Sequence, residues 1–378
     1  MALKIAIVTE YYYPLLGGIT EHVHHTAKRL RAQGHAVTII TSATGANGVP
    51  AGEAVTPAAP VIRIGRSIPL RSNGSIAHAT VGVHLWRDLR IVFLRERFDI
   101  AQLHSPLTFT LPALSVLASP CRSIGTFHTF FDGSRVYARF RHVLQKHLVD
   151  KLDGQTFVSQ CSIDSLQRFF TLKDPRIIPN GVDLTLFNPA VPRLAGFDRS
   201  KRTLLFLGRF DKRNGLALMI AAFALVRRRF PDVRLIVVGD GHRRRSFQRS
   251  VPAALRDDVH FVGPAIASRP SYYATCDIFC SPVAIASFGM TLLEAMASGK
   301  PIVATDNVGY RDLLGPGEAV LVPRGSPEAF ADAIGALLAD DVRRKEMGEN
   351  GLRKAARYSW DRVVEETLAL YHEILSRP

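Results

Sequence analysis

A glycine turn that opens an apolar helix with a single carboxylate is the part of this sequence with the clearest potential for chemistry. Residues 287–299 read Ser-Phe-Gly-Met-Thr-Leu-Leu-Glu-Ala-Met-Ala-Ser-Gly, and a buried strand is expected over 301–304. A helix that starts at Gly289 leaves backbone N–H groups unpaired at the positive end of its dipole, which favours phosphate. Glu294, just over one turn further on, could accept hydrogen bonds from hydroxyls beside that phosphate, such as a ribose diol. The alternative is an ordinary strand–helix–strand unit with a surface glutamate.

Glycines and an arginine also follow other expected strands. Residues 208–215 read Gly-Arg-Phe-Asp-Lys-Arg-Asn-Gly, and they follow an apolar run at 203–207. Arg209 therefore stands at the carboxyl end of a strand, where α/β sheets bind ligands, and the alternative for it is a surface salt bridge. Gly17 and Gly18 lie between the first strand and the first helix, where glycines let a backbone approach a pyrophosphate, although a tight turn explains them equally well. The spacing does not match the Gly-x-Gly-x-x-Gly pattern of nicotinamide-binding proteins.

The elements that must position these residues alternate between strand and helix. Strands are expected over 4–8, 36–41, 100–104, 123–126, 157–158, 203–207, 234–238, 259–262, 278–282 and 301–304. Helices are expected over 20–33, 81–96, 135–152, 163–170, 216–229 and 360–375. This alternation indicates parallel sheets covered by helices on both faces. Irregular chain between about 176 and 198, with several prolines, predicts a boundary between two domains.

Several motifs, in the same order along the chain, resemble the glycosyltransferases of family 4. The Ser-Phe-Gly turn with Glu294 is similar to the donor site of that family, and Gly-Gly-x-x-x-His-Val at 17–23 is similar to its first turn. Gly-Thr-Phe-His-Thr at 125–129 resembles a segment of the phosphatidylinositol mannosyltransferases, although a single histidine is more often structural. Asn73, Gly74 and Ser75 resemble the acceptor-side loop of the same enzymes.

The resemblance implies an α/β fold of the GT-B type, with two facing Rossmann-like domains, a cleft between them and a C-terminal helix that crosses back to the first domain. The expected domains are an acceptor-side domain over 1–190, a nucleotide-sugar domain over 199–357 and the returning helix over 358–378. The implied reaction moves a hexose, such as mannose, from a GDP- or UDP-linked donor to a lipid-linked or polyol acceptor with retention of configuration. No metal or other cofactor is expected.

The resemblance also assigns roles to individual residues. His128, Arg209 and Glu294 are the expected catalytic residues. The expected donor-binding residues are Gly17, Gly18, Arg209, Arg213, Asn214, Gly239, Val262, Phe288, Gly289, Met290, Thr291 and Glu294. Asn73, Gly74 and Ser75 are expected on the acceptor side.

Two positions depart from the family pattern. Ala286 stands where the family has a first glutamate that contacts the donor sugar, and Asn214 stands where it has a lysine that binds phosphate. Lys212 or Arg213 could supply the missing charge. The departures leave two alternatives open: a nucleotide-sugar-binding protein with weak or no transferase activity, and a glycosyltransferase that acts on a soluble acceptor.

The charge of the chain favours anionic partners. Its 378 residues contain 48 Lys and Arg against 33 Asp and Glu, a formal net charge of +15. The expected helix 81–96 carries Arg87, Arg90 and Arg95, which predicts contact with an acidic membrane surface, and an exposed polar helix face is the alternative. No nucleic-acid-binding motif is present, so nucleic acid is not an expected partner.

Other sequence features bear on location. No signal peptide is recognised, and no apolar run approaches the roughly 20 residues of a membrane span. The 4 cysteines do not form a disulfide framework, and the spacing of Cys276 and Cys280 gives only weak support for zinc. We therefore expect a cytoplasmic protein that associates peripherally with the inner face of the membrane.

Overall fold

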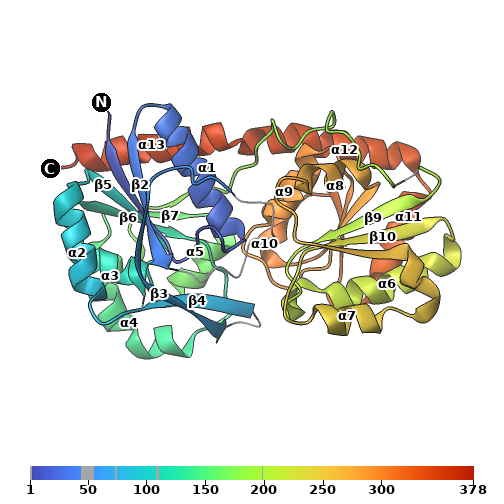
Figure 1. Cartoon of the computed structure of the whole chain (residues 1–378), viewed down its shortest axis with the longest axis horizontal. Helices are drawn as coiled ribbons and strands as arrows, with labels where there is room; N and C mark the ends of the chain where they lie inside the picture. Colours follow the sequence, from blue (N-terminus) through green and yellow to red (C-terminus); the bar gives the residue numbers. More distant parts are fainter. Residues whose placement is uncertain (1, 44–54, 73–74, 108–109, 198) are drawn as a thin grey trace. The chain divides into compact units, whose positions relative to one another are not determined.

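The chain folds into two compact units, and the first of them is formed by two separate segments of the sequence. The structure is a computed structural model and describes residues 2–43, 55–72, 75–107, 110–197 and 199–378 (Figure 1). The first unit joins Met1–Gly181 with Trp360–Pro378, and the second is the continuous segment Val182–Ser359. Residues 182–190, which the sequence assigned to the first domain, therefore pack with the second unit, as do residues 358–359, which were assigned to the returning helix.

The first unit is built on one sheet with the strand order β4-β3-β2-β1-β5-β6-β7-β8. Its strands are β1 (Lys4–Val8), β2 (Ala36–Ala43), β3 (Val61–Ser72), β4 (Ser75–Val81), β5 (Ile100–His104), β6 (Arg122–Phe127), β7 (Gly154–Phe157) and β8 (Pro175–Ile177). All neighbours are parallel except β3 and β4. β1 and β5 are buried on both faces, which explains the apolar run Ile-Ala-Ile-Val in β1, whereas β5 also buries Gln102 and His104. The chain order reverses between β1 and β5, so their carboxyl ends form a switch point where ligands commonly bind.

Helices cover both faces of this sheet. They are α1 (Gly18–Ala32), α2 (Leu85–Glu96), α3 (Leu111–Ala118), α4 (Arg135–His147), α5 (Gln160–Gln167) and α13 (Trp360–Ser376). Leu89, Val116 and Leu144, from α2, α3 and α4, belong to one core cluster with the sheet residues Val8 and Leu103. α1 packs against α13 instead. The three helices α2, α3 and α4 therefore form one layer on a single face of the sheet, and this layer has an outer side toward solvent (Figure 1).

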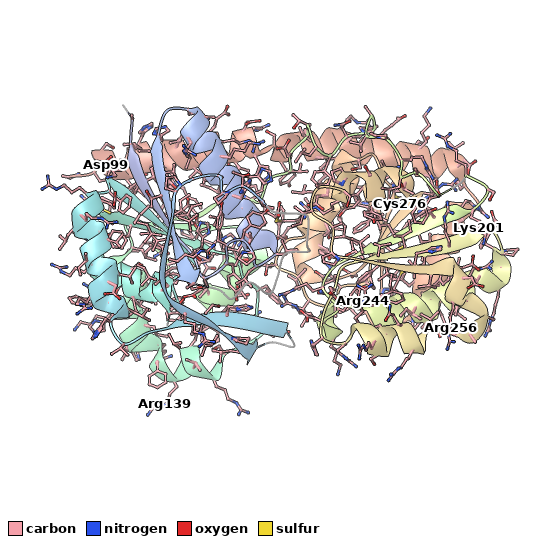
Figure 2. All side chains as sticks on the ribbon, in the orientation of Figure 1. Asp99, Arg139, Lys201, Arg244, Arg256 and Cys276 are labelled. Atoms are coloured by element: carbon pink, nitrogen blue, oxygen red, sulfur yellow. The ribbon has the colours of Figure 1, made fainter. Side chains whose placement is uncertain are left out.

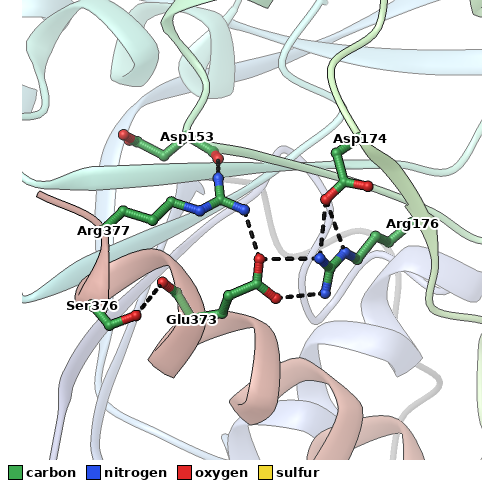
Figure 3. Close-up of polar contacts among 6 residues, drawn as sticks. All are labelled: Asp153, Asp174, Arg176, Glu373, Ser376 and Arg377. Carbon is green, nitrogen blue, oxygen red and sulfur yellow. Dashed lines mark hydrogen bonds and ion pairs between the residues drawn. The ribbon is translucent and has the colours of Figure 1, made fainter.

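The C-terminal helix α13 is tied into the first unit by ion pairs as well as by its apolar face. Arg176 of β8 holds both carboxylate oxygens of Glu373, at 2.6 and 3.0 Å, and also pairs with Asp174 (Figure 3). Arg377 donates to Glu373 and to the backbone carbonyl of Asp153. These contacts anchor α13 at the edge of the sheet formed by β7 and β8.

The segment that precedes α2 differs from the sequence expectation. The helix begins at Leu85 and not at residue 81, because residues up to Val81 belong to an antiparallel hairpin in which Arg66 pairs with Val81. Ser72 pairs with Ser75 at the tip of this hairpin. Ser75 begins β4, while Asn73 and Gly74 lie outside the described residues.

The second unit is a wholly parallel sheet with the order β11-β10-β9-β12-β13-β14. Its strands are β9 (Arg202–Leu207), β10 (Val233–Val238), β11 (Val259–Gly263), β12 (Ile278–Ser281), β13 (Ile302–Thr305) and β14 (Ala319–Val322). Its helices are α6 (Leu216–Arg229), α7 (Arg244–Ser250), α8 (Arg269–Thr275), α9 (Met290–Ala297), α10 (Val308–Arg311), α11 (Pro327–Leu338) and α12 (Asp341–Ala355). The chain order reverses between β9 and β12, so the loops after these two strands border the switch point of this sheet.

Candidate active site

A glycine stands at the carboxyl end of three strands of the second unit, so no side chain projects from these three positions. Gly208 and Gly239 follow β9 and β10, and Gly263 ends β11. The Gly239 N–H donates to the Gly263 carbonyl at 2.7 Å. Gly239 has a φ of +133°, and a Cβ there would lie 2.0 Å from the Gly208 carbonyl oxygen, so no other residue fits. Beside these glycines, the side chain of Val262 is 37% exposed and could contact a flat ligand.

The predicted glycine turn at the start of α9 is present. Gly289 is the N-cap residue of α9 with a φ of +131°, and no side chain caps the helix. A Cβ at this position would lie 2.7 Å from Leu292 and 2.9 Å from Tyr310. Phe288 is buried and packs its ring edge-on against Tyr358. The first turn of α9, which begins with Met290 and Thr291, therefore offers backbone N–H groups that can donate hydrogen bonds to an anion.

Glu294 lies in this helix, but its carboxylate is buried and engaged. Arg269 approaches Oε1 at 3.2 Å, and the exposed fractions of the two side chains are 17% for Arg269 and 6% for Glu294. The Tyr273 hydroxyl lies 2.9 Å from Oε2 and 3.1 Å from the carbonyl oxygen of Thr291. Burial and the nearby charge of Glu294 raise the pKa of Tyr273 well above its usual value. Arg269 and Tyr273 thus fix the orientation of the Glu294 carboxylate.

Sequence reasoning did not identify Arg269 or Tyr273. Both belong to α8, a short helix that carries no motif, and they reach Glu294 only because α8 packs beside α9. The ring of Phe187 supports the arrangement, since it lies under the guanidinium of Arg269 and edge-on to Tyr273.

The loop after β9 holds Arg209 beside a buried acid. The Arg209 guanidinium lies 3.4 Å from the carboxylate of Asp211, and the arginine side chain is partly exposed. The side-chain amide of Asn214 donates to the Arg209 carbonyl oxygen at 2.7 Å. Asn214 therefore clamps the loop rather than presenting a charge. Lys212 is a second exposed cation on this loop, whereas Arg213 is partly buried and its carbonyl accepts from the Ala284 N–H.

The loop that contains Ala286 connects β12 to α9 and is held by α10. The amide of Asn307 donates to the Val283 carbonyl at 2.9 Å, and the Ser281 hydroxyl contacts the Tyr310 hydroxyl at 2.8 Å. The methyl group of Ala286 can neither accept nor donate a hydrogen bond. This loop thus keeps a defined backbone without the carboxylate that the family pattern has at this position.

In the first unit, His128 is part of a cluster of histidines at the switch point. His104 ends β5, and His128 directly follows β6. Their ring centroids lie 5.0 Å apart with the planes nearly parallel, and His104 Nδ1 lies 2.7 Å from His128 Nε2. The ring of His22, on α1, meets both rings at an angle, 5.3 and 5.1 Å away. His22 Nδ1 donates to the side-chain oxygen of Asn180 at 2.9 Å, and the ring contacts Trp360.

Burial keeps these histidines neutral. It lowers the pKa of His22 to about 4 and lowers the pKa values of His104 and His128 well below their usual range, and the neighbouring imidazoles add to the shift. His128 was predicted from the sequence as a catalytic residue, and His22 lies within the motif at residues 17–23. His104 was not predicted. The signal for His104 was its place at the end of a strand, because carboxyl ends of neighbouring parallel strands meet at one edge.

The remaining predicted residues can be placed briefly. Gly17 is the N-cap of α1 without a side-chain cap, and Gly17 and Gly18 are exposed. Within the described residues, no group of three or more His, Cys, Asp or Glu side chains is arranged as a metal site. None of the helices in the described part of the chain is long and apolar enough to span a membrane.

Comparisons with known proteins agree with this geometry. The family models "Glycosyltransferase Family 4" and "Glycosyl transferases group 1" match residues 16–186 and 201–340. The chain is 30% identical to a phosphatidyl-myo-inositol mannosyltransferase of Mycobacterium leprae, over 98% of this chain and 97% of that one. The structure is similar to sucrose-phosphate synthase from Thermosynechococcus elongatus (TM-score 0.80, 21% identity, 99% of each chain). It is also similar to Anabaena HepE in complex with UDP-glucose (TM-score 0.74, 18% identity, 97% and 99% of the two chains). The chain has the GT-B fold of two Rossmann-like domains, and it is a hexosyltransferase that belongs to the family 4 glycosyltransferases.

Proposed function

We propose that this enzyme transfers a hexose, such as mannose, from a GDP- or UDP-linked donor to a hydroxyl of a lipid-linked or polyol acceptor at an acidic membrane surface. The observation that carries the proposal is the switch point of the second unit. There α9 begins without a side-chain cap and carries the fixed carboxylate of Glu294, and the strands β9 and β10 are followed by Gly208 and Gly239. HepE has been crystallised with UDP-glucose, and the Mycobacterium leprae relative is named a phosphatidyl-myo-inositol mannosyltransferase. Both proteins support the proposal by analogy.

In the second unit, the elements suit the parts of a nucleotide diphosphate. The diphosphate would accept hydrogen bonds from the first turn of α9 and would pair with Arg209, so that negative charge on the leaving group is stabilised as it develops. Lys212 is the exposed cation that would replace the family lysine at Asn214. The ribose diol would donate to Glu294, and the base would lie on Val262 and on the glycines that follow β9 and β10. These groups stabilise the leaving group without a metal.

In the first unit, His128 would hydrogen-bond to the donor sugar. Transfer breaks the bond between the anomeric carbon and the diphosphate oxygen and forms a bond from that carbon to the acceptor oxygen. The acceptor hydroxyl loses its proton, which the departing diphosphate can take up. Retention requires the acceptor to add on the face that the diphosphate leaves. The family pattern assigns His128, Arg209 and Glu294 to catalysis. His128 belongs to the first unit, and the other two belong to the second.

The outer side of the α2, α3 and α4 layer supports the membrane location. Val136, Phe140 and Val143 are exposed on α4, which is kinked at Phe140, and Phe140 is 48% exposed. The sequence of α4 contains arginines and lysine but no acidic residue. Arg139 points away from the sheet, and its guanidinium lies 5.8 Å from the centre of the Phe140 ring (Figure 2). Exposed apolar and cationic side chains on the same helix favour the interface of an anionic bilayer.

Helices α2 and α3 also carry exposed apolar side chains. Trp86 and Ile91 on α2 and Leu117 on α3 are also exposed. The arginines of α2, which the sequence put forward, are thus accompanied by apolar side chains that can enter the headgroup region. We call the exposed apolar residues of α2, α3 and α4 the helical face.

A panel of donors and acceptors tests the proposal. Stabilisation of the protein by each sugar nucleotide is measured first, because specific binding raises the apparent stability by mass action. Transfer is then assayed with GDP-mannose and UDP-glucose, using vesicles that contain phosphatidylinositol or free inositol as acceptors, and the anomeric configuration of the product is read by NMR. We expect transfer to the lipid. Stabilisation without transfer would instead support a nucleotide-sugar-binding protein, which the absence of a carboxylate at Ala286 makes the leading alternative. Transfer only to free inositol would move the acceptor into solution.

A further inference from the structure

We propose that His104 is a positioning residue that orients His128 and directs its ring proton to Nδ1, so that His128 presents an N–H donor to a hydroxyl of the donor sugar. The inference rests on the proposed function for the contact between His128 and the sugar. It assigns a task to His104, a residue that no motif singled out, and it names the nitrogen of His128 that meets the substrate.

The geometry determines which nitrogen of His128 is available. His104 Nδ1 and His128 Nε2 are 2.7 Å apart, a short hydrogen-bonding distance, and the two ring planes are only 22° apart, so the rings meet edge to edge. The Nε2 atom of His128 is therefore occupied by His104. Only Nδ1 of His128 remains for a ligand.

The direction of this hydrogen bond follows from the other nitrogen of His104. His104 is 2% exposed, and its Nε2 atom has no hydrogen-bond partner among the described residues. A buried N–H without an acceptor is rarer in proteins than a buried acceptor without a donor. The proton of His104 is therefore on Nδ1, where it donates to His128 Nε2, and Nε2 of His104 carries a bare lone pair.

The proton of His128 is fixed by the same bond. A neutral imidazole has one N–H and one acceptor nitrogen, so a ring that accepts at Nε2 carries its proton at Nδ1. The two rings are neutral near pH 7, because burial and the adjacent imidazole of His22 disfavour a second proton. His128 is thus prepared as a hydrogen-bond donor, and a sugar hydroxyl is a suitable acceptor.

Substitutions at His104 separate hydrogen bonding from packing. His104→Phe keeps an aromatic ring at this position but cannot donate a hydrogen bond to His128. His104→Asn carries an amide N–H near the position of Nδ1. We expect His104→Phe to lower kcat about 10-fold or more, a change of the size seen when a group that orients a catalytic residue is lost. Donor Kd should stay within about 2-fold, since nucleotide contacts dominate affinity. His104→Asn should keep kcat within about 3-fold of wild type. His142→Asn, at an exposed position on α4, is the matched control.

NMR of ¹⁵N-labelled histidine reads the ring protons directly. In the substrate-free wild-type protein at pH 7, we expect His104 and His128 each to be protonated at Nδ1, and His128 to lose that preference in His104→Phe. Protonation of wild-type His128 at Nε2, or full kcat in His104→Phe, would overturn the inference.

The two measurements also separate this inference from the proposed function. The tautomers are observed without substrate, so a wild-type protein that transfers no sugar would remove the proposed function, while the NMR result would still decide whether His104 sets the proton of His128.

Discussion

Glu294 has two tasks, because the carboxylate that we propose binds a ribose also neutralises the buried guanidinium of Arg269. Removing one partner of a buried ion pair commonly costs about 3–5 kcal/mol, since it leaves the other charge without compensation. Removing both partners costs less. Loss of stability and loss of donor binding can therefore be separated by a double substitution.

We predict that Glu294→Ala lowers both the thermal stability of the second unit and the affinity for the donor nucleotide. The double variant Glu294→Ala with Arg269→Met should recover most of the stability but none of the affinity, because the lost charge-assisted hydrogen bonds contribute about 1.5–3 kcal/mol. Differential scanning and titration calorimetry measure the two effects. Tyr273→Phe is the milder control and should keep most of the affinity. Normal nucleotide binding by the double variant would place the ribose elsewhere.

A second prediction at the residue scale concerns acid. His22 has its pKa lowered to about 4, and the pKa values of His104 and His128 are also lowered. Between the unfolded pKa of about 6.5 and these folded values, the unfolded chain binds more protons than the folded one. Stability is therefore complete above about pH 6.5 and falls on acidification, by up to about 1.4 kcal/mol per pH unit for each histidine.

Urea unfolding of the first unit at pH 7, 6 and 5 checks this prediction. The slope of stability against pH should be smaller in His104→Phe and unchanged in His142→Asn. A first unit that is equally stable at pH 5 and pH 7 would contradict the neutral state of the cluster.

At this scale, the sequence identified residues that belong to local motifs and missed those whose partners are distant. Gly289 and Glu294 lie within one short segment, so their relation can be inferred from spacing. His104 meets His128 from another strand, 24 residues away. Arg269 meets Glu294 from another helix. Such pairs depend on which strands and helices are neighbours, and the spacing of residues does not contain that information.

At the scale of elements, most strands and helices follow from apolar runs, but the hairpin of β3 and β4 does not. Its strands alternate apolar and polar residues only weakly, and the sequence analysis treated the region before α2 as the start of a helix. The dipeptide Asn73-Gly74, which lies outside the described residues, is in general a sequence signal for a hairpin and could have pointed to the pairing of β3 with β4. The helical face is a further feature of elements, because it requires the orientation of α4 relative to the sheet.

We predict that replacing Val136, Phe140 and Val143 together by Ser weakens binding to acidic vesicles about 10-fold or more without lowering stability, because these side chains are exposed in the folded protein. Binding of the wild-type protein should also weaken with salt, since screening reduces the attraction of its arginines. Co-sedimentation with neutral and acidic vesicles measures both. Val342→Ser, which changes a 69% exposed side chain on α12, is the control and should have no effect. Equal binding by the triple variant would assign membrane contact to another surface.

At the scale of the whole molecule, the second unit is a continuous insertion between two parts of the first. The helix α13 supplies buried side chains to the first unit, among them Trp360, Val364 and Tyr371. The hydroxyl of Tyr371 donates to Gln102 of β5 at 2.6 Å. The first unit therefore lacks part of its core without α13, whereas the second unit contains all of its own core within residues 182–359.

We predict that residues 182–359 fold and bind donor nucleotide when produced alone. A protein truncated after residue 359 should keep the unfolding transition of the second unit and lose that of the first, because an apolar face of the first unit is left uncovered. Calorimetry of both fragments, with and without nucleotide, gives the result. Two intact transitions in the truncated protein would show that α13 is dispensable.

The anchoring of α13 has a consequence for how the protein is made. Residues 1–181 emerge from the ribosome first. Their core is complete only after Trp360–Pro378 has also emerged, because this segment belongs to the same unit. Domains usually fold in the order of their synthesis, and here that order is reversed, since the second unit emerges whole while the first is still unfinished. The nascent N-terminal segment thus remains exposed to chaperones and proteases until Trp360–Pro378 has emerged, and a premature stop within α13 yields a chain whose second unit folds and whose first unit does not.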